Sequence, residues 1–281
     1  MTCDWLAWFI HQKFGLLSPL DRIRRDLAER GMERAADLLA PIDGHHWRKL
    51  LSGTWMATDG TGLEVLVPGL PAAHDGDVEL YRNTECAVFP YAAQKGSDDV
   101  VAKLQPFCGT LTADAEHRYN AVYATGRVIE AGCNAHGRRK LRDAEQTQPV
   151  LAKKGGAFIA AMYVAEDEAR KAGLVGEALR AHRQQHIQPI ADDFAKWLAA
   201  VEPPLLPSDP LTTAVDRKHW SALLRVIADP EVPIDNSPTE RELQNVAKLR
   251  LNMLFAGSTE GAHRARVLRR DVLHRRRSDA G

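Results

Sequence analysis

The chain has 281 residues, of which 44% are hydrophobic and 26% are charged, and its 37 basic residues balance its 37 acidic residues. This composition is ordinary for a globular protein with a real core, and it does not by itself indicate a nucleic-acid binder. The four cysteines lie far apart without a Cys-x-x-Cys pair, which argues against structural zinc and against a disulfide framework. No signal peptide is recognised, and the segment WLAWFI is too short to cross a bilayer, so we expect a cytoplasmic protein.

The N-terminal region, residues 1–48, is predicted to be helical. Apolar residues recur at helical spacing in LDRIRRDLAERGMERAADLLA, with a break at Gly31 between two short helices. An arginine-rich pair of helices is compatible with a DNA-binding arm, but a packing hairpin is the commoner meaning of this pattern.

The next region, residues 49–150, is predicted to be the first part of a mixed sheet with helices on it. The segments TWMAT, LEVLV, VELYR and ECAVFPYA have the composition of short strands. A short helix with Ser97 as its cap follows, and then come the strands GTLTAD and RVIEAGC with the helix EHRYNAVYA between them. Strands followed by a strand-helix-strand unit indicate the α/β class.

Residues 151–230 are predicted to form a large helical insertion, and residues 231–281 a further helix and a basic tail. Phe158 and Met162 begin one apolar stripe, and Phe194 and Trp197 belong to another. From Arg250 onward there are eight arginines against three acidic residues, which suits either a phosphate-binding face or a solvated tail.

Three acidic residues stand out as candidate metal ligands. Asp59 and Asp114 each follow a predicted strand, although Asp59 before Gly60 also fits a turn and Asp114 also fits a helix cap. In Ser-Pro-Thr-Glu, Glu240 stands three residues after Ser237, which is the spacing of a capping box. From the neighbouring residues alone, a turn at Asp59 and helix caps at Asp114 and Glu240 are the favoured interpretations. The spacing of three carboxylates that are far apart in the sequence is only a weak signal for a shared site.

Three carboxylates brought together would hold hard divalent cations. Oxygen ligands suit Mg²⁺ or Mn²⁺ better than Zn²⁺. Two such ions about 4 Å apart can activate a nucleophile and stabilise the leaving oxygen of a phosphoryl displacement.

Longer segments carry a resemblance to a known family. GTLTADAEHRYNAVYATGRVIEAGCNAHGRRKL, PSDPLTTAVDRKHWSALLRVIADPEVPIDNSPTER and LFAGSTEGAHRARVL look like the core of transposases of the insertion-sequence 66 family. HQKFGLLSPLDRIRRDLAERGM is similar to the family's segment ahead of its first catalytic aspartate. The resemblance runs in order from about residue 11 to about residue 268.

The resemblance implies a ribonuclease-H-like core of the DDE type with a helical insertion between its second and third acidic residues. Carried over by motif, Asp59, Asp114 and Glu240 would be the catalytic carboxylates and would bind two Mg²⁺ or Mn²⁺ ions. The implied partners are the DNA of the element's ends and of the target, with a homo-oligomer and accessory proteins as further expectations. We expect phosphate contacts from basic residues in two places: Arg138, Arg139, Lys140, Arg142, Arg264 and Arg266.

Some positions depart from the family pattern. The family usually has Asp-Glu-Thr at the first site, where this chain has Gly60 after Asp59, and Asn-Asn before the third carboxylate, where it has Asn236-Ser237. Asn134 and Gly137 stand where the family usually has Trp and Ala. The family's N-terminal zinc-binding segment is not recognised, and the pattern is lost from about residue 269.

Three interpretations therefore stay open: an active transposase, a truncated and inactive remnant that keeps the fold and DNA binding, and a related nuclease with another substrate. The nuclease leaves the insertion motifs unexplained. Cys133 and His136 resemble a metal pair, but a buried cysteine and a histidine near a helix start are the expected default. The basic run at 138–142 is equally compatible with a solvated helix face.

Overall fold

The computed structural model describes residues 35–65, 74–93, 96–114, 117–201, 210–214 and 217–252. Of the two predicted N-terminal helices, the first, before Gly31, lies outside these ranges, and the second is described only from Ala35, where α3 begins. The basic C-terminal tail with Arg264 and Arg266 also lies outside them. Among the described residues, no helix combines the length and the apolar character that a membrane crossing needs.

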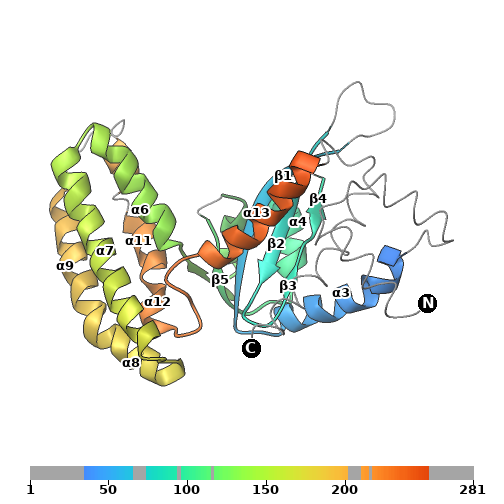
Figure 1. Ribbon diagram of the computed structural model, residues 1–281, viewed down its shortest axis with the longest axis horizontal. Coiled ribbons are helices and arrows are strands. Elements are labelled where there is room, and N and C mark those ends of the chain that lie inside the picture. The colour runs from blue at the N-terminus through green and yellow to red at the C-terminus, as the bar shows by residue number, and fades with distance from the viewer. Residues whose placement is uncertain are drawn as a thin grey trace. The chain divides into compact units, whose positions relative to one another are not determined.

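Six strands belong to one mixed sheet (Figure 1). Its order is β3-β2-β1-β5-β6, with β4 also paired to β2. The strands β1, β2, β3 and β4 pair antiparallel, whereas β5 and β6 are parallel. The bounds are β1 Trp55–Val65, β2 His74–Arg82, β3 Ala87–Val88, β4 Tyr91–Ala92, β5 Gly109–Thr112 and β6 Val128–Ala131. The predicted α/β class is confirmed, and the sheet with its flanking helices is consistent with a ribonuclease-H-like core.

The helices follow the predicted order along the chain, with differences at their ends. Helix α4 begins at Ser97, but its N-cap residue is Gly96 and no side chain caps it, so the predicted Ser97 cap is wrong. The bounds are α3 Ala35–Leu51, α4 Ser97–Leu104, η2 His117–Tyr119, α5 Asn120–Tyr123, α6 Asn134–Asp143, η3 Ala144–Gln146, α7 Pro149–Lys171, α8 Gly176–His186, α9 Gln188–Val201, α10 Pro210–Ala214, α11 Arg217–Leu223, α12 Arg225–Ala228 and α13 Ser237–Asn252.

The described chain divides into two compact units, and each is considered by itself. The first draws its residues from Met1–Cys108, Arg118–Val122 and Thr239–Gly281. The second draws its residues from Gly109–His117 and Tyr123–Pro238. The first unit therefore contains Asp59 and Glu240, and the second contains Asp114.

In the first unit, helices cover both faces of the β1–β2 ladder because successive side chains of a strand point to opposite faces. On one face, α13 lies across β1 and β2 (Figure 1), where Leu243 joins a buried cluster with Leu63, Val78 and Leu80. On the other face, the α3 residue Trp47 meets the ring of Tyr81 edge-on, with ring centroids 5.2 Å apart.

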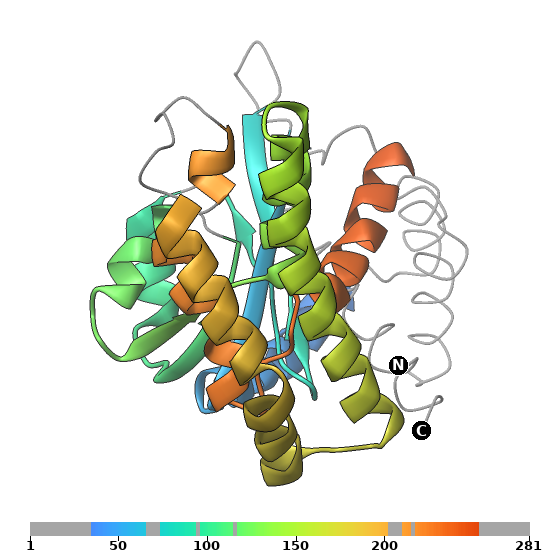
Figure 2. The ribbon, with the colours of Figure 1, turned by 90° about the vertical axis from the view of Figure 1, so that its left-hand side faces the viewer.

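In the second unit, α6, α7, α8 and α9 form a helical bundle; α7 packs beside α9, as Figure 2 shows in yellow-green and gold. Its core contains an aromatic cluster in which the Phe194 ring lies 5.1 Å from Phe158, 5.7 Å from Trp197 and 4.2 Å from Trp220, measured between centroids. The predicted apolar stripes of these helices therefore do face one another.

Candidate active site

Asp59 lies in the middle of β1 rather than at a strand end. TWMAT and LEVLV were predicted as separate strands with an Asp-Gly turn between them, but a single strand runs from Trp55 to Val65. The antiparallel ladder with β2 continues through this point, with Asp59 opposite Leu80 and Gly60 opposite Glu79. The turn interpretation of Asp59 is therefore wrong, and its carboxylate is a half-buried group on the sheet, where Oδ1 accepts the Gly60 N–H at 2.8 Å.

A buried ionic network lies on the sheet face opposite to Asp59. The Arg118 Nη1 atom is 2.9 Å from Glu79 Oε1 and 3.4 Å from Asp77 Oδ2. The Lys103 Nζ atom donates to Glu79 Oε2 at 2.9 Å, and the Tyr81 hydroxyl donates to the same oxygen at 3.1 Å. Two cations thus balance two carboxylates that are almost fully buried, which is the condition under which buried charges are tolerated.

Gly60 is packed against this network. A Cβ atom at position 60 would lie 2.7 Å from Asp77 Oδ2 and 3.0 Å from Arg118 Nη2. No larger side chain fits there while the Asp77–Arg118 pair stays in place. The departure from Asp-Glu-Thr therefore has a local structural reason, and because neighbouring residues of a strand face opposite ways, it leaves the side of Asp59 unchanged.

Asp114 lies just beyond the end of β5, after Ala113, so its predicted position at a strand end is confirmed. Its side chain is 44% exposed, and its Oδ2 atom lies 3.7 Å from Nε2 of His136, which is 26% exposed. His136 belongs to the first turn of α6. The second unit therefore places a partly exposed carboxylate and an imidazole side by side, an arrangement in which the imidazole can orient the carboxylate.

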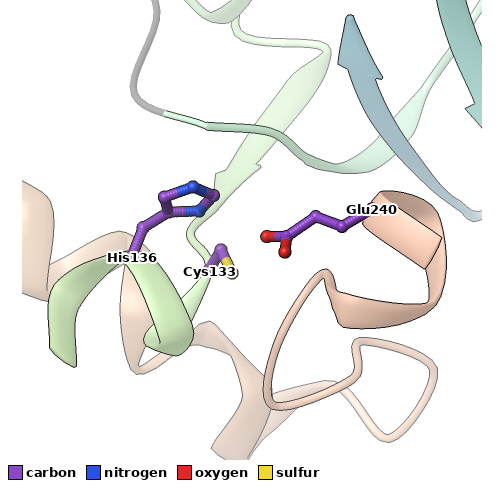
Figure 3. A group of neighbouring side chains, drawn as sticks. All are labelled: Cys133, His136 and Glu240. Carbon is purple, nitrogen blue, oxygen red and sulfur yellow. The ribbon is translucent and has the colours of Figure 1, made fainter. Parts of the chain in front are cut away.

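Cys133 and Asn134 fasten the start of α6 to the segment that follows the insertion (Figure 3 shows Cys133 and His136 on their elements). Cys133 is buried, and its Sγ atom accepts the backbone N–H of Asn236 at 3.2 Å. The Asn134 side chain donates to the carbonyl oxygens of Leu223 at 3.0 Å and of Ile234 at 2.9 Å. Asn134 thus has a structural role at the position where the family usually has Trp.

The departure at Gly137 is explained by packing against the insertion. A Cβ atom at this position would lie 3.0 Å from Cδ1 of Leu223. Gly132, before α6, is packed against the same leucine, because its Cβ would lie 2.8 Å from Leu223 Cδ2. The small residue at 137 therefore lets α6 approach Leu223 closely.

Glu240 lies in the first turn of α13, on the helix drawn at the right of Figure 3. The predicted capping box required Glu240 to accept the Ser237 N–H. That N–H instead donates to Oδ1 of Asp235 at 3.0 Å, so the capping-box interpretation is wrong. The carboxylate of Glu240 is not used for the local role that competed with metal binding.

Among the described residues, the arginine and lysine side chains of α6 have no ion-pair partner. Arg138, Arg139 and Arg142 are exposed and Lys140 is half-buried. No acidic side chain in the described part of the chain lies within ion-pair distance of these four groups. Exposed basic side chains of this kind are what a phosphate-binding surface would need.

Comparison with known proteins identifies the family. The chain matches the family described as "Transposase IS66 family" over residues 1–264. The chain belongs to this transposase family. Two curated proteins of Sinorhizobium fredii (strain NBRC 101917 / NGR234) are also similar to it. "Uncharacterized protein y4hP" is 26% identical over 94% of this chain, and "Uncharacterized protein y4jD" is 25% identical over 63%. The chain spans 54% of the length of the first and 36% of the length of the second.

Membership of the IS66 transposase family bears out the resemblance, whereas several supporting residues of the site have no signal in the sequence motifs. Asp77 and Glu79 alternate with apolar residues in β2, which marks one face of the strand as polar but does not show that this face is buried. Tyr163 of α7 donates to Asp235, 72 positions later, at 2.8 Å. A pair so far apart is found only when the fold is known.

Proposed function

We propose that this chain is the catalytic core of a DNA transposase, in which Asp59, Asp114 and Glu240 are the metal-binding carboxylates of strand cleavage and strand transfer. The family match over residues 1–264 carries the proposal. In support, Asp59 lies in the middle of β1, Asp114 lies just beyond the end of β5, and Glu240 lies in the first turn of α13.

The donor set fits a hard divalent cation. All three residues offer carboxylate oxygens, the ligands that Mg²⁺ and Mn²⁺ prefer. Glu240 is not required by the cap of α13, and Asp59 is not required by a turn. When bound, a pair of such ions would activate the attacking hydroxyl and stabilise the leaving oxygen of the phosphodiester.

The chain's own contribution is to position these carboxylates and to bind the DNA backbone. His136 lies beside Asp114, 3.7 Å from its carboxylate, and the ladder between β1 and β2 fixes the backbone at Asp59. The exposed arginines of α6 bind phosphates, together with Arg264 and Arg266 of the arginine-rich C-terminal sequence.

Replacing Asp114 tests the catalytic proposal. Asp114→Asn keeps the size of the side chain but removes the charge that holds the metal, so strand transfer in Mn²⁺ should be abolished while binding of the same DNA is retained. The substrate is a duplex that carries the DNA flanking the gene, and the products are resolved on a sequencing gel. Asp143→Asn, at an exposed position at the end of α6, is the matched control and should stay active.

Two outcomes of this experiment decide against the proposal. Full strand cleavage by Asp114→Asn would exclude Asp114 as a catalytic carboxylate. Binding of the DNA by the unmodified protein without cleavage in either Mg²⁺ or Mn²⁺ would favour the alternative, an inactive chain that keeps the fold and binds DNA.

The salt dependence of DNA binding tests the α6 surface. Each phosphate contact that is lost should reduce the slope of log K against log salt by about 0.9. Arg138→Gln combined with Arg139→Gln should therefore lower the slope by nearly 2, measured by fluorescence anisotropy between 50 and 200 mM salt. Arg170→Gln, an exposed residue of α7 that pairs with Asp167, is the control. An unchanged slope in the α6 variant would exclude this surface from the interface.

A further inference from the structure

The entry to α13 is held by a side chain of the helical insertion. The Tyr163 hydroxyl, on α7, donates to Oδ2 of Asp235 at 2.8 Å. The other carboxylate oxygen of Asp235 accepts the backbone N–H of Ser237, the first residue of α13, at 3.0 Å. One carboxylate thus connects the insertion to the first helical peptide of α13.

Two further contacts hold the neighbouring residues of the same segment. The backbone N–H of Asn236 donates to Sγ of Cys133, and the Asn134 side chain donates to the Ile234 carbonyl. Asn236 itself is only 2% exposed. Every residue from 234 to 237 therefore makes at least one hydrogen bond that fixes the direction in which α13 begins.

Glu240 is three residues after Ser237, in the same first turn of this helix. Since a helical turn is a rigid unit, its direction sets the direction of the Cα–Cβ bond of Glu240. We propose that Tyr163 is a positioning residue, which acts through Asp235 to hold the first turn of α13 in the orientation that Glu240 needs to bind metal. This inference rests on the proposed function of Glu240.

The chemistry of the Tyr163–Asp235 pair suits such a permanent contact. Burial, and then the hydrogen bond to Asp235, raise the pKa of Tyr163 well above its usual value. The hydroxyl therefore stays protonated and donates throughout the pH range in which phosphoryl transfer on DNA is measured. A hydrogen bond to an ionised acceptor is stronger than one between neutral groups.

A consequence is that α7 has a role beyond packing in the helical bundle of the insertion. A ligand is held in place by the partners that surround it, and changing such partners typically costs 10–100-fold in metal affinity or activity. Tyr163 contacts Glu240 only indirectly, through Asp235 and the first turn of α13. We therefore expect a loss of metal affinity near the lower end of this range, about tenfold.

The test is Mn²⁺ binding to the full chain, followed by isothermal titration calorimetry and by the electron paramagnetic resonance signal of free Mn²⁺. Tyr163→Phe removes only the hydroxyl and should raise the Mn²⁺ dissociation constant about tenfold. In the strand-transfer assay it should lower kcat and leave the KM for DNA unchanged.

Ile159→Val is the matched control for lost stability. Ile159 is fully buried on α7, one turn before Tyr163, and its truncation should lower the melting temperature to a similar extent. A positioning role predicts that Ile159→Val binds Mn²⁺ as the unmodified chain does. Equal Mn²⁺ affinities of Tyr163→Phe and Ile159→Val would overturn the inference.

Asp235 variants test the connection itself. Asp235→Ala should weaken Mn²⁺ binding at least as much as Tyr163→Phe, and adding Tyr163→Phe to it should have no further effect, because both act through one carboxylate. Asp235→Asn keeps an oxygen for the Ser237 N–H and an amide for the Tyr163 hydroxyl, and should restore most of the affinity. Additive effects of the two changes would contradict the connection.

Glu240→Gln separates failure of this inference from failure of the proposed function. If Glu240→Gln weakens Mn²⁺ binding but Tyr163→Phe does not, the positioning role alone is refuted. If Glu240→Gln binds Mn²⁺ normally, the assignment of Glu240 as a ligand is refuted, and the role of Tyr163 falls with it.

Discussion

Gly60→Ala is expected to destabilise the protein, because the added methyl group meets a buried ion pair. It would lie 2.7 Å from Asp77 Oδ2 and 3.0 Å from Arg118 Nη2, both closer than van der Waals contact allows. Asp77 is fully buried, so its carboxylate has to move within the protein and lengthen its 3.4 Å contact with Arg118. Overpacking a core typically costs about 1–3 kcal/mol.

The size of the destabilisation by Gly60→Ala depends on which contacts the Asp77–Arg118 pair keeps after it is displaced. Removing one partner of a buried ion pair costs about 3–5 kcal/mol, but here both partners remain and Arg118 keeps its 2.9 Å contact with Glu79. The loss should therefore stay within the overpacking range, and we expect the free energy of unfolding to fall by about 2 kcal/mol.

Gly62→Ala provides the matched control for this substitution. Gly62 lies two residues further along β1 on the same face, and its Cβ would meet nothing closer than the Gly76 carbonyl oxygen at 3.9 Å. Neither position 60 nor 62 has a positive φ, so alanine is compatible with the backbone and should stabilise the chain at 62 by about 0.5 kcal/mol. Urea unfolding followed by tryptophan fluorescence would measure both variants. Stabilities that agree within about 0.5 kcal/mol would refute the close approach at Gly60.

Two further predictions concern the insertion. Arg183→Met should lower the free energy of unfolding by about 3 kcal/mol, since Arg183 is buried and its guanidinium binds Glu166 and the three carbonyls of Val226, Asp229 and Val232. Arg180→Met removes a half-exposed arginine on the same helix and should cost less than about 0.5 kcal/mol in the same urea experiment. The raised pKa of Tyr163 predicts that its contribution to stability is complete below pH 10 and falls as the pH rises above 10, because the unfolded chain then loses a proton that the folded chain keeps. The stability of a Tyr163→Phe variant should therefore fall less steeply between pH 10 and 11 than that of the unmodified chain. Parallel stability curves for the two proteins would contradict the buried hydroxyl.

The sequence predicted the class of the fold because its apolar periodicity agrees with its tertiary packing. The alternating strands and the helical stripes of α7 and α9 are recognisable locally, and both are buried as expected. Asp59-Gly60 was misjudged because the turn propensity of Asp-Gly is a local preference. Pairing of β1 with β2 through nine residue pairs overrides that preference and keeps the strand continuous.

The difference between local preference and tertiary contacts also explains why the capping-box prediction was wrong. Ser-Pro-Thr-Glu has the spacing of a box, but a carboxylate two residues before Ser237 reaches the same N–H from the other side. Asp235 is available for this bond because Tyr163 holds its other oxygen, and nothing near residue 235 in the sequence indicates a tyrosine at 163. The sequence shows that both Asp235 and Glu240 could accept the Ser237 N–H, but it does not show the Tyr163–Asp235 contact that favours Asp235.

These contacts also change how the departures from the family pattern bear on activity. Gly60 and Asn134 differ from the usual family residues, and the structure accommodates both. Gly60 is packed against the Asp77–Arg118 pair, and the Asn134 side chain donates to two backbone carbonyls. Under the proposed function, the substitutions that would argue for an inactive chain are those at Asp59, Asp114 and Glu240, and the sequence keeps a carboxylate at all three positions.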